Sequence, residues 1–67
     1  MRIKYFQAEY GVITNGQPAI ETRIWKQDTD TGERWDEMVV EYKAAPLEKI
    51  AMASGRPQEI SAEFAKH

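Results

Sequence analysis

The side chains that could support catalysis are few in this sequence. The single histidine is the last residue, His67, where chain ends are usually poorly ordered. There is no cysteine, and the serines are Ser54 and Ser61, so a nucleophile, a base and an orienting group cannot be assembled from the usual parts. Asp36 and Glu37 are neighbours that would point to opposite sides of a strand. We therefore expect no enzymatic activity and no catalytic residue.

Two short motifs near the middle of the chain resemble functional signatures, but a turn explains them better. Asp30-Thr31-Gly32 matches the tripeptide of aspartic proteases without the apolar strands that should flank it. Asp28 and Asp30 are spaced like the start of a calcium loop. The glycine, however, stands at the fifth position, and Val39 stands at the twelfth, where a glutamate is needed. We predict no metal site and no cofactor.

A group of aromatic, apolar and charged residues has the composition of a protein-binding site. Tryptophan, tyrosine and arginine supply much of the energy of protein interfaces, and an apolar centre with a charged rim is typical of them. The candidate protein-binding residues are Tyr5, Arg23, Trp25, Trp35, Glu37, Val39 and Glu41.

The charge distribution indicates the kind of partner. Residues 28–41 contain six acids and one base, a local charge of −5 in a chain of net charge −2. An acidic surface repels nucleic-acid phosphates and attracts basic protein surfaces. We expect a protein partner with a basic surface. A nucleic-acid-binding sheet module and a homodimeric structural protein are the alternatives.

One β-hairpin, from Ile20 to Tyr42, must position these residues. Its turn has Gly32 where a left-handed residue is needed. This register sets Ile24 opposite Met38 on the face that also carries the other apolar side chains, and it sets Lys26 opposite Asp36 as a pair of opposite charges. Both tryptophans then fall together on the outer face. A rival interpretation of 34–45 as a helix also fits its apolar spacing and would separate the two tryptophans.

The strand before the hairpin, residues 2–13, changes phase near Tyr5. Either a bulge resets the facing there, or the first residues lie on the other side of the sheet. A turn follows at Asn15-Gly16. A two-residue turn would place Gln7 and Glu9 on the core face, so we expect a three-residue loop, Asn15–Gln17.

The C-terminal part of the chain predicts helices at about 46–54 and 57–65. Pro46 suits a first helical turn, Gly55 suits a C-cap, and Ile60 and Phe64 are four residues apart. The expected fold class is α+β, a three-stranded antiparallel β-meander with one or two C-terminal helices packed on one face. Its strands are expected at about 2–13, 19–28 and 33–43.

The 67 residues are enough for one small domain, 1–67, whose core is marginal in size. No stretch is long and apolar enough to be a signal peptide or to span a bilayer, so we expect a cytoplasmic protein without membrane association. The leading hypothesis is a non-catalytic protein-binding module, an inhibitor, adaptor or accessory factor. Its size is typical of products encoded by phages or mobile elements.

Overall fold

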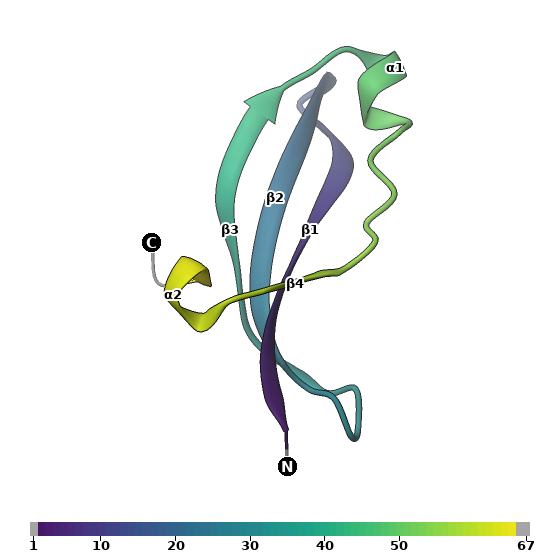
Figure 1. Cartoon of the computed structure of the whole chain (residues 1–67). Coiled ribbons are helices and arrows are strands. Elements are labelled where there is room, and N and C mark those ends of the chain that lie inside the picture. Colours follow the sequence, from purple (N-terminus) through teal and green to yellow (C-terminus); the bar gives the residue numbers. More distant parts are fainter. Residues whose placement is uncertain (1, 66–67) are drawn as a thin grey trace.

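The computed structural model describes residues 2–65 as an antiparallel sheet with two short helices (Figure 1). The elements are β1 (Ile3–Thr14), β2 (Gln17–Asp28), β3 (Arg34–Ala44), α1 (Leu47–Ile50), β4 (Gln58–Ile60) and α2 (Ala62–Ala65). The strand order is β3-β2-β1-β4, so the first three strands form the expected meander. The antiparallel α+β class is confirmed, but the prediction of three strands is wrong because a fourth joins the sheet.

The additional strand, β4, replaces the first part of the helix expected at 57–65, and only its last part, α2, is helical. It pairs antiparallel with β1, with Ile60 opposite Tyr5. Pro57 keeps the residue before it out of helical angles, and the free edge of β1 offers backbone hydrogen bonds that so short a helix cannot match. The helix expected at 46–54 is also shorter than predicted and consists of the single turn of α1.

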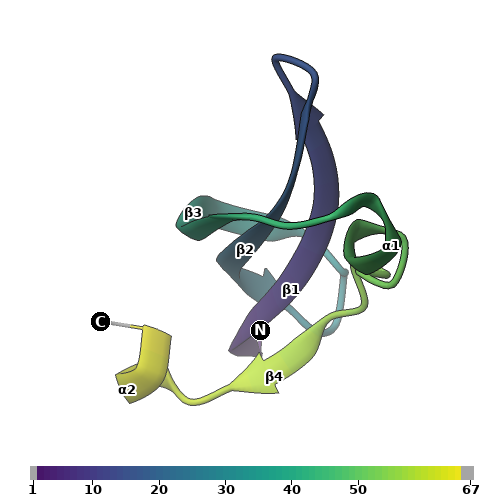
Figure 2. The ribbon, with the colours of Figure 1, turned by 90° about the horizontal axis from the view of Figure 1, so that it is seen from above.

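The two helices do not form a layer over one face of the sheet. Figures 1 and 2 show α1 beside one end of the β1–β2 hairpin. They show α2 beyond the end of β4, well separated from α1. No residue of α1 is buried, and Phe64 of α2 is 56% exposed. The buried hydrophobic residues of the described chain all come from the two central strands: Ala8, Ala19, Ile24 and Trp25.

The β1–β2 connection is a two-residue turn, so the expected three-residue loop is wrong. Asn15 and Gly16 have φ angles of 53° and 76°, as a type I′ turn requires. Thr14 lies opposite Gln17, and Val12 lies opposite Ala19 rather than Ile20. Polar residues on a core face would exclude this register only if the sheet buried a single face. In the structure both faces contribute to the core, so polar residues of β1 can lie beside Ile24.

This register divides the two central strands between two faces. The Trp25 face carries Phe6, Ala8, Tyr10, Ala19, Glu21, Arg23 and Trp25. The Ile24 face carries Tyr5, Gln7, Glu9, Gly11, Ile20, Thr22, Ile24 and Lys26. The pairing of β1 with β2 runs without a shift from Ile3 to Thr14. The phase change near Tyr5 is therefore not a bulge, and Ile3 and Tyr5 lie on the opposite side from Phe6.

β3 is a strand, as expected, and the helical alternative for 34–45 is excluded. Ile24 lies opposite Met38 as predicted, and Lys26 forms the predicted ion pair with Asp36 at 3.4 Å. On either side of Met38, however, β3 shifts register by one residue, between Thr22 and Arg23 and between Ile24 and Lys26. Each shift is a bulge, in which β3 carries one residue more than β2.

Gly11 determines where α1 can lie on the Ile24 face. A Cβ atom at this position would overlap the carbonyl oxygen of Ile50 and lie 2.9 Å from the Ile50 Cβ atom. Only a glycine permits this approach of a strand to the end of a helix. The α1 turn is thus placed over one end of the Ile24 face and leaves the rest of that face open.

Candidate functional site

The structure divides the seven predicted binding residues between the two faces. Arg23, Trp25, Glu37 and Val39 lie on the Trp25 face, whereas Tyr5, Trp35 and Glu41 lie on the Ile24 face. The bulge between Thr22 and Arg23 moves Glu41 to the Ile24 face, and the bulge between Ile24 and Lys26 separates the two tryptophans. The second of these bulges sets Trp35 opposite Lys26, and the side chain of Lys26 points away from that of Trp25. The two tryptophans therefore do not share one exposed surface.

Trp25 is a core residue. Its side chain is 1% exposed and stacks on Phe6 with ring centroids 6.2 Å apart. The guanidinium of Arg34 lies 4.3 Å from the centroid of its ring, within cation–π range. The indole Nε1 donates a hydrogen bond to Gln27 Oε1 at 2.9 Å. With its ring covered and its polar atom satisfied, Trp25 cannot contact a partner directly.

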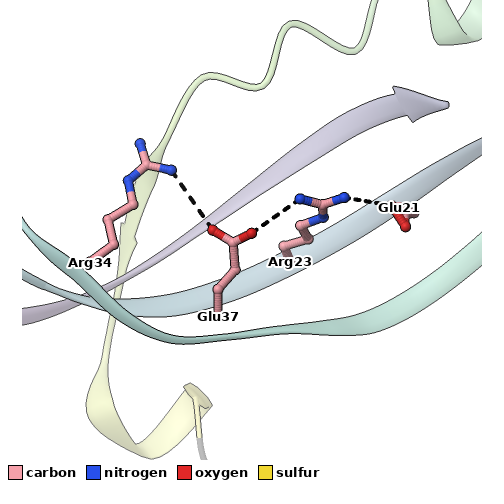
Figure 3. Close-up of polar contacts among 4 residues, drawn as sticks. All are labelled: Glu21, Arg23, Arg34 and Glu37. Atoms are coloured by element: carbon pink, nitrogen blue, oxygen red, sulfur yellow. Dashed lines mark hydrogen bonds and ion pairs between the residues drawn. The ribbon is translucent and has the colours of Figure 1, made fainter.

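A chain of ion pairs crosses the Trp25 face from β2 to β3 (Figure 3). Arg23 donates from Nη2 to Glu21 Oε1 at 2.9 Å and from Nη1 to Glu37 Oε2 at 3.1 Å. Arg34 Nη1 lies 4.0 Å from the other oxygen of Glu37. These two acids and two bases neutralise one another, so most of the charge on this face is compensated by ion pairs within the protein.

The hydrogen bonds also raise the pKa of the Arg23 guanidinium above its ordinary value. The bond to Glu21 is the main cause, and the charges of Glu21 and Glu37 act in the same direction, whereas burial opposes them. Arg23 also lies over the ring of Tyr10, 4.9 Å from its centroid. Arg23 therefore links the two strands as a fixed cation rather than presenting a free charge to a ligand.

The Ile24 face carries partly exposed aromatic and apolar side chains on adjacent strands. Tyr5, Lys26 and Trp35 form one row across β1, β2 and β3. The Lys26 Nζ atom lies 5.9 Å from the centroid of the Tyr5 ring. In the neighbouring row Met38 is 56% exposed beside the buried Ile24. Aromatic side chains and methionine are enriched at protein interfaces.

The same face is hollowed where α1 meets the sheet. One hollow of about 320 Å³ is lined by Glu9, Ile20, Lys49, Met52 and Ala53. A second, of about 230 Å³, shares Glu9, Ile20 and Lys49 and adds Glu41 and Lys43 at the β3 side. The hollows have an apolar floor and a rim of both charges, an arrangement suited to holding an apolar side chain of another protein.

Sequence reasoning missed Ile20, Met38, Lys49 and Met52 as parts of this surface. A single core beneath a helical layer would bury Ile20 and Met38, but α1 and α2 are short and form no such layer. The Asn15-Gly16 turn could have revealed this, because a two-residue turn fixes which residues of β1 share a face with Ile20.

Within residues 2–65 no group of three or more histidine, cysteine, aspartate or glutamate side chains is placed to hold a metal ion. No helix in this part of the chain is long and apolar enough to cross a membrane. Comparisons with protein-family models, with curated proteins and with solved structures found no match for this chain.

Proposed function

We propose that this protein is a non-catalytic protein-binding module that contacts its partner through the Ile24 face. The observation that supports this proposal most strongly is the imbalance of its apolar residues. In the described chain four hydrophobic residues are buried, whereas nine large ones are exposed. Adjoining apolar side chains exposed on a soluble protein often mark an interaction site.

The Ile24 face fits this role better than the Trp25 face. It carries three of the predicted binding residues, Tyr5, Trp35 and Glu41, together with the exposed Met38 and the hollows beside α1. On the Trp25 face the charged side chains are paired with one another and the tryptophan is buried. Binding energy is more readily gained from side chains that are half-exposed and unengaged.

The partner is expected to present a basic surface with an apolar side chain at its centre. Residues 28–41 have a charge of −5, and Glu41 forms no ion pair with any other residue in the range 2–65. Charge complementarity of this kind steers association and makes it depend on salt. An inhibitor, adaptor or accessory factor acting in the cytoplasm, encoded by a phage or mobile element, would work in this way.

The test compares two lysine substitutions at equally exposed apolar residues. Met38→Lys places a charge in the centre of the Ile24 face, and Phe64→Lys makes the same change in α2, where the side chain is also 56% exposed. Tagged wild-type protein and both variants are used to capture partners from the native host. The partner is then purified, and its affinity for each protein is measured by calorimetry.

We expect Met38→Lys to abolish capture and Phe64→Lys to retain it, with circular dichroism showing both variants folded. Equal capture by all three proteins would refute the use of this face. A partner that binds equally well in low and high salt would refute the proposed charge complementarity.

The alternative of nucleic-acid binding is less well supported. Its arginines would have to contact phosphates, but Arg23 is hydrogen-bonded to two glutamates and Arg34 lies over Trp25. Anisotropy measurements with labelled DNA and RNA at low salt test this alternative, which requires an affinity that falls steeply as salt is added.

A further inference from the structure

The outer edge of β3 is an open strand edge. β3 ends the sheet, and ten of its eleven residues are exposed, all except Trp35. At its centre Val39 and Val40 are 48% and 43% exposed. The outward backbone N–H and C=O groups of such an edge can pair with another strand. The bulges of β3 determine which strand can fit.

The bulges give residues 36–43 an unusual order of faces. Met38, Glu41 and Lys43 lie on the Ile24 face, since they pair with Ile24, Thr22 and Ile20. Asp36 reaches the same face, where it contacts Lys26. Glu37, Val39 and Tyr42 lie on the Trp25 face, opposite or bonded to residues of that face. Val40 is the extra residue of the bulge and shares with Val39 the position opposite Arg23.

Read from residue 36 to residue 43, this order of faces is the same in both directions. Its centre lies between Val39 and Val40, at the bulge. A regular strand alternates without interruption, so it would fall out of phase with β3 on one side of the bulge. A strand that carries the same interruption, running in the opposite direction, stays in phase along the whole segment.

We propose that the partner of this edge is a second copy of the chain, with the two β3 strands paired antiparallel about a two-fold axis between Val39 and Val40. Each Val39 then lies opposite Val40 of the second copy, and each Met38 lies opposite Glu41 of the second copy. Shifting the second copy by one residue would set Met38 opposite Tyr42 or Val40, which lie on the other face of the sheet. The requirement that paired side chains lie on the same face of the sheet is thus enough to determine the register of self-pairing.

The charges agree with this register. Asp36 lies opposite Lys43 of the second copy, both on the Ile24 face, and the two-fold axis repeats the pair at the other end. The Asp36 side chain is 72% exposed, and Lys43 forms no ion pair within residues 2–65. Shifting the strands by two residues would set Asp36 opposite Glu41 in one direction and opposite Ala45 in the other. Opposite charges facing each other stabilise a strand pair, and like charges destabilise it.

Dimerisation goes beyond the proposed function, because it uses the backbone edge of β3 rather than the Ile24 face, although the side chains of Met38 and Glu41 belong to both. It would join the two sheets into one and bring two Ile24 faces to the same side. It would also cover the exposed side chains of Val39 and Val40, which helps a chain with so small a core.

The experiment exchanges charges at the proposed pair and measures association by sedimentation equilibrium from low micromolar to near-millimolar concentrations. Asp36→Lys gives two lysines at each pair, and Lys43→Asp gives two aspartates. Each variant alone should raise the dimer Kd by about tenfold or more, whereas an equimolar mixture of the two should form heterodimers as tightly as wild type. Glu48→Lys makes the same charge change as Asp36→Lys on α1 and should leave the Kd unchanged.

A second measurement does not depend on the variants being folded. Wild-type protein labelled with ¹⁵N is mixed with unlabelled protein and treated with a zero-length carbodiimide crosslinker. The proposed register predicts a crosslinked peptide that joins Asp36 of one isotope to Lys43 of the other. A wild-type protein that stays monomeric at all concentrations would overturn the proposal. So would a mixture that fails to associate, or crosslinks confined to other residue pairs.

Discussion

The burial of Trp25 leads to the sharpest prediction on stability. Trp25 is the largest fully buried side chain of the described structure, at 1% exposure. Replacing a buried tryptophan by alanine costs about 3–5 kcal/mol, because apolar contacts are lost and a cavity remains. A domain of 67 residues is stable by roughly 3–10 kcal/mol in total, at about 0.05–0.15 kcal/mol per residue. The Trp25→Ala variant should therefore be largely unfolded at room temperature or close to it.

Trp35→Ala is the matched control, since it deletes the same atoms from a half-buried position on the other face. Partial burial of a large apolar side chain contributes about 1 kcal/mol, so this variant should remain folded. For a domain of this size that loss corresponds to a fall in Tm of about 4–8 °C. Far-UV circular dichroism during heating and urea denaturation, at one fixed protein concentration, measures both variants.

The opposite outcome would refute the assignment of faces. If Trp25→Ala melted within a few degrees of wild type while Trp35→Ala unfolded, Trp35 would be the core residue. The sequence-based prediction of an exposed Trp25 would then regain support. If both variants unfolded, Trp35 would belong to the core as well and could not serve a binding surface on the Ile24 face.

Two further substitutions test the placement of α1 and the ion pairs. Gly11→Ala should displace α1 because the added methyl group meets Ile50, and this should lower stability by about 1–3 kcal/mol. Amide exchange should become faster at residues 47–53 but not in β2. Unchanged exchange at 47–53 would contradict the contact. Glu37→Gln should lower stability by less than about 1 kcal/mol, because the Glu37 and Arg23 side chains are each about one-third exposed and solvent weakens their ion pair. The loss of stability should become smaller as salt is added. A loss independent of salt would contradict this electrostatic account.

The features predicted correctly from the sequence are those that depend on local pattern. Alternating side chains place the first three strands within a few residues of their observed bounds, and Gly32 adopts the expected left-handed conformation with a φ angle of 80°. The neighbours Ile24–Met38 and Lys26–Asp36 are also correct. The Lys26–Asp36 contact forms even though the bulge between Ile24 and Lys26 sets Trp35 opposite Lys26, because Asp36 lies next to Trp35 and reaches the same face.

The β1–β2 register and β4 were predicted wrongly for different reasons. The three-residue loop followed from the assumption of a single buried face, but the conformational preference of Asn15-Gly16 decided the turn. β4 has three residues, too few to show the alternation of a strand, and it forms because β1 has a free edge. A long-range pairing of this kind cannot be seen in the local sequence.

The separation of Trp25 from Trp35 has a more general cause. One inserted residue moves every side chain beyond it to the other face, so a correct strand can still present the wrong surface. The bulge near Asp36 leaves only a weak trace in the sequence: an aspartate, one of the few residue types that tolerate the observed φ of 51°. The bulge at Val40 leaves none, because valine is typical of regular strands. The bulge at Val40 makes it hard to predict which side chains of β3 share a face. It also gives β3 its symmetric order of faces. A bulge leaves an edge strand out of phase with regular strands, and this discourages aggregation. In the proposed dimer the second copy stays in phase along residues 36–43 because it carries the same bulge.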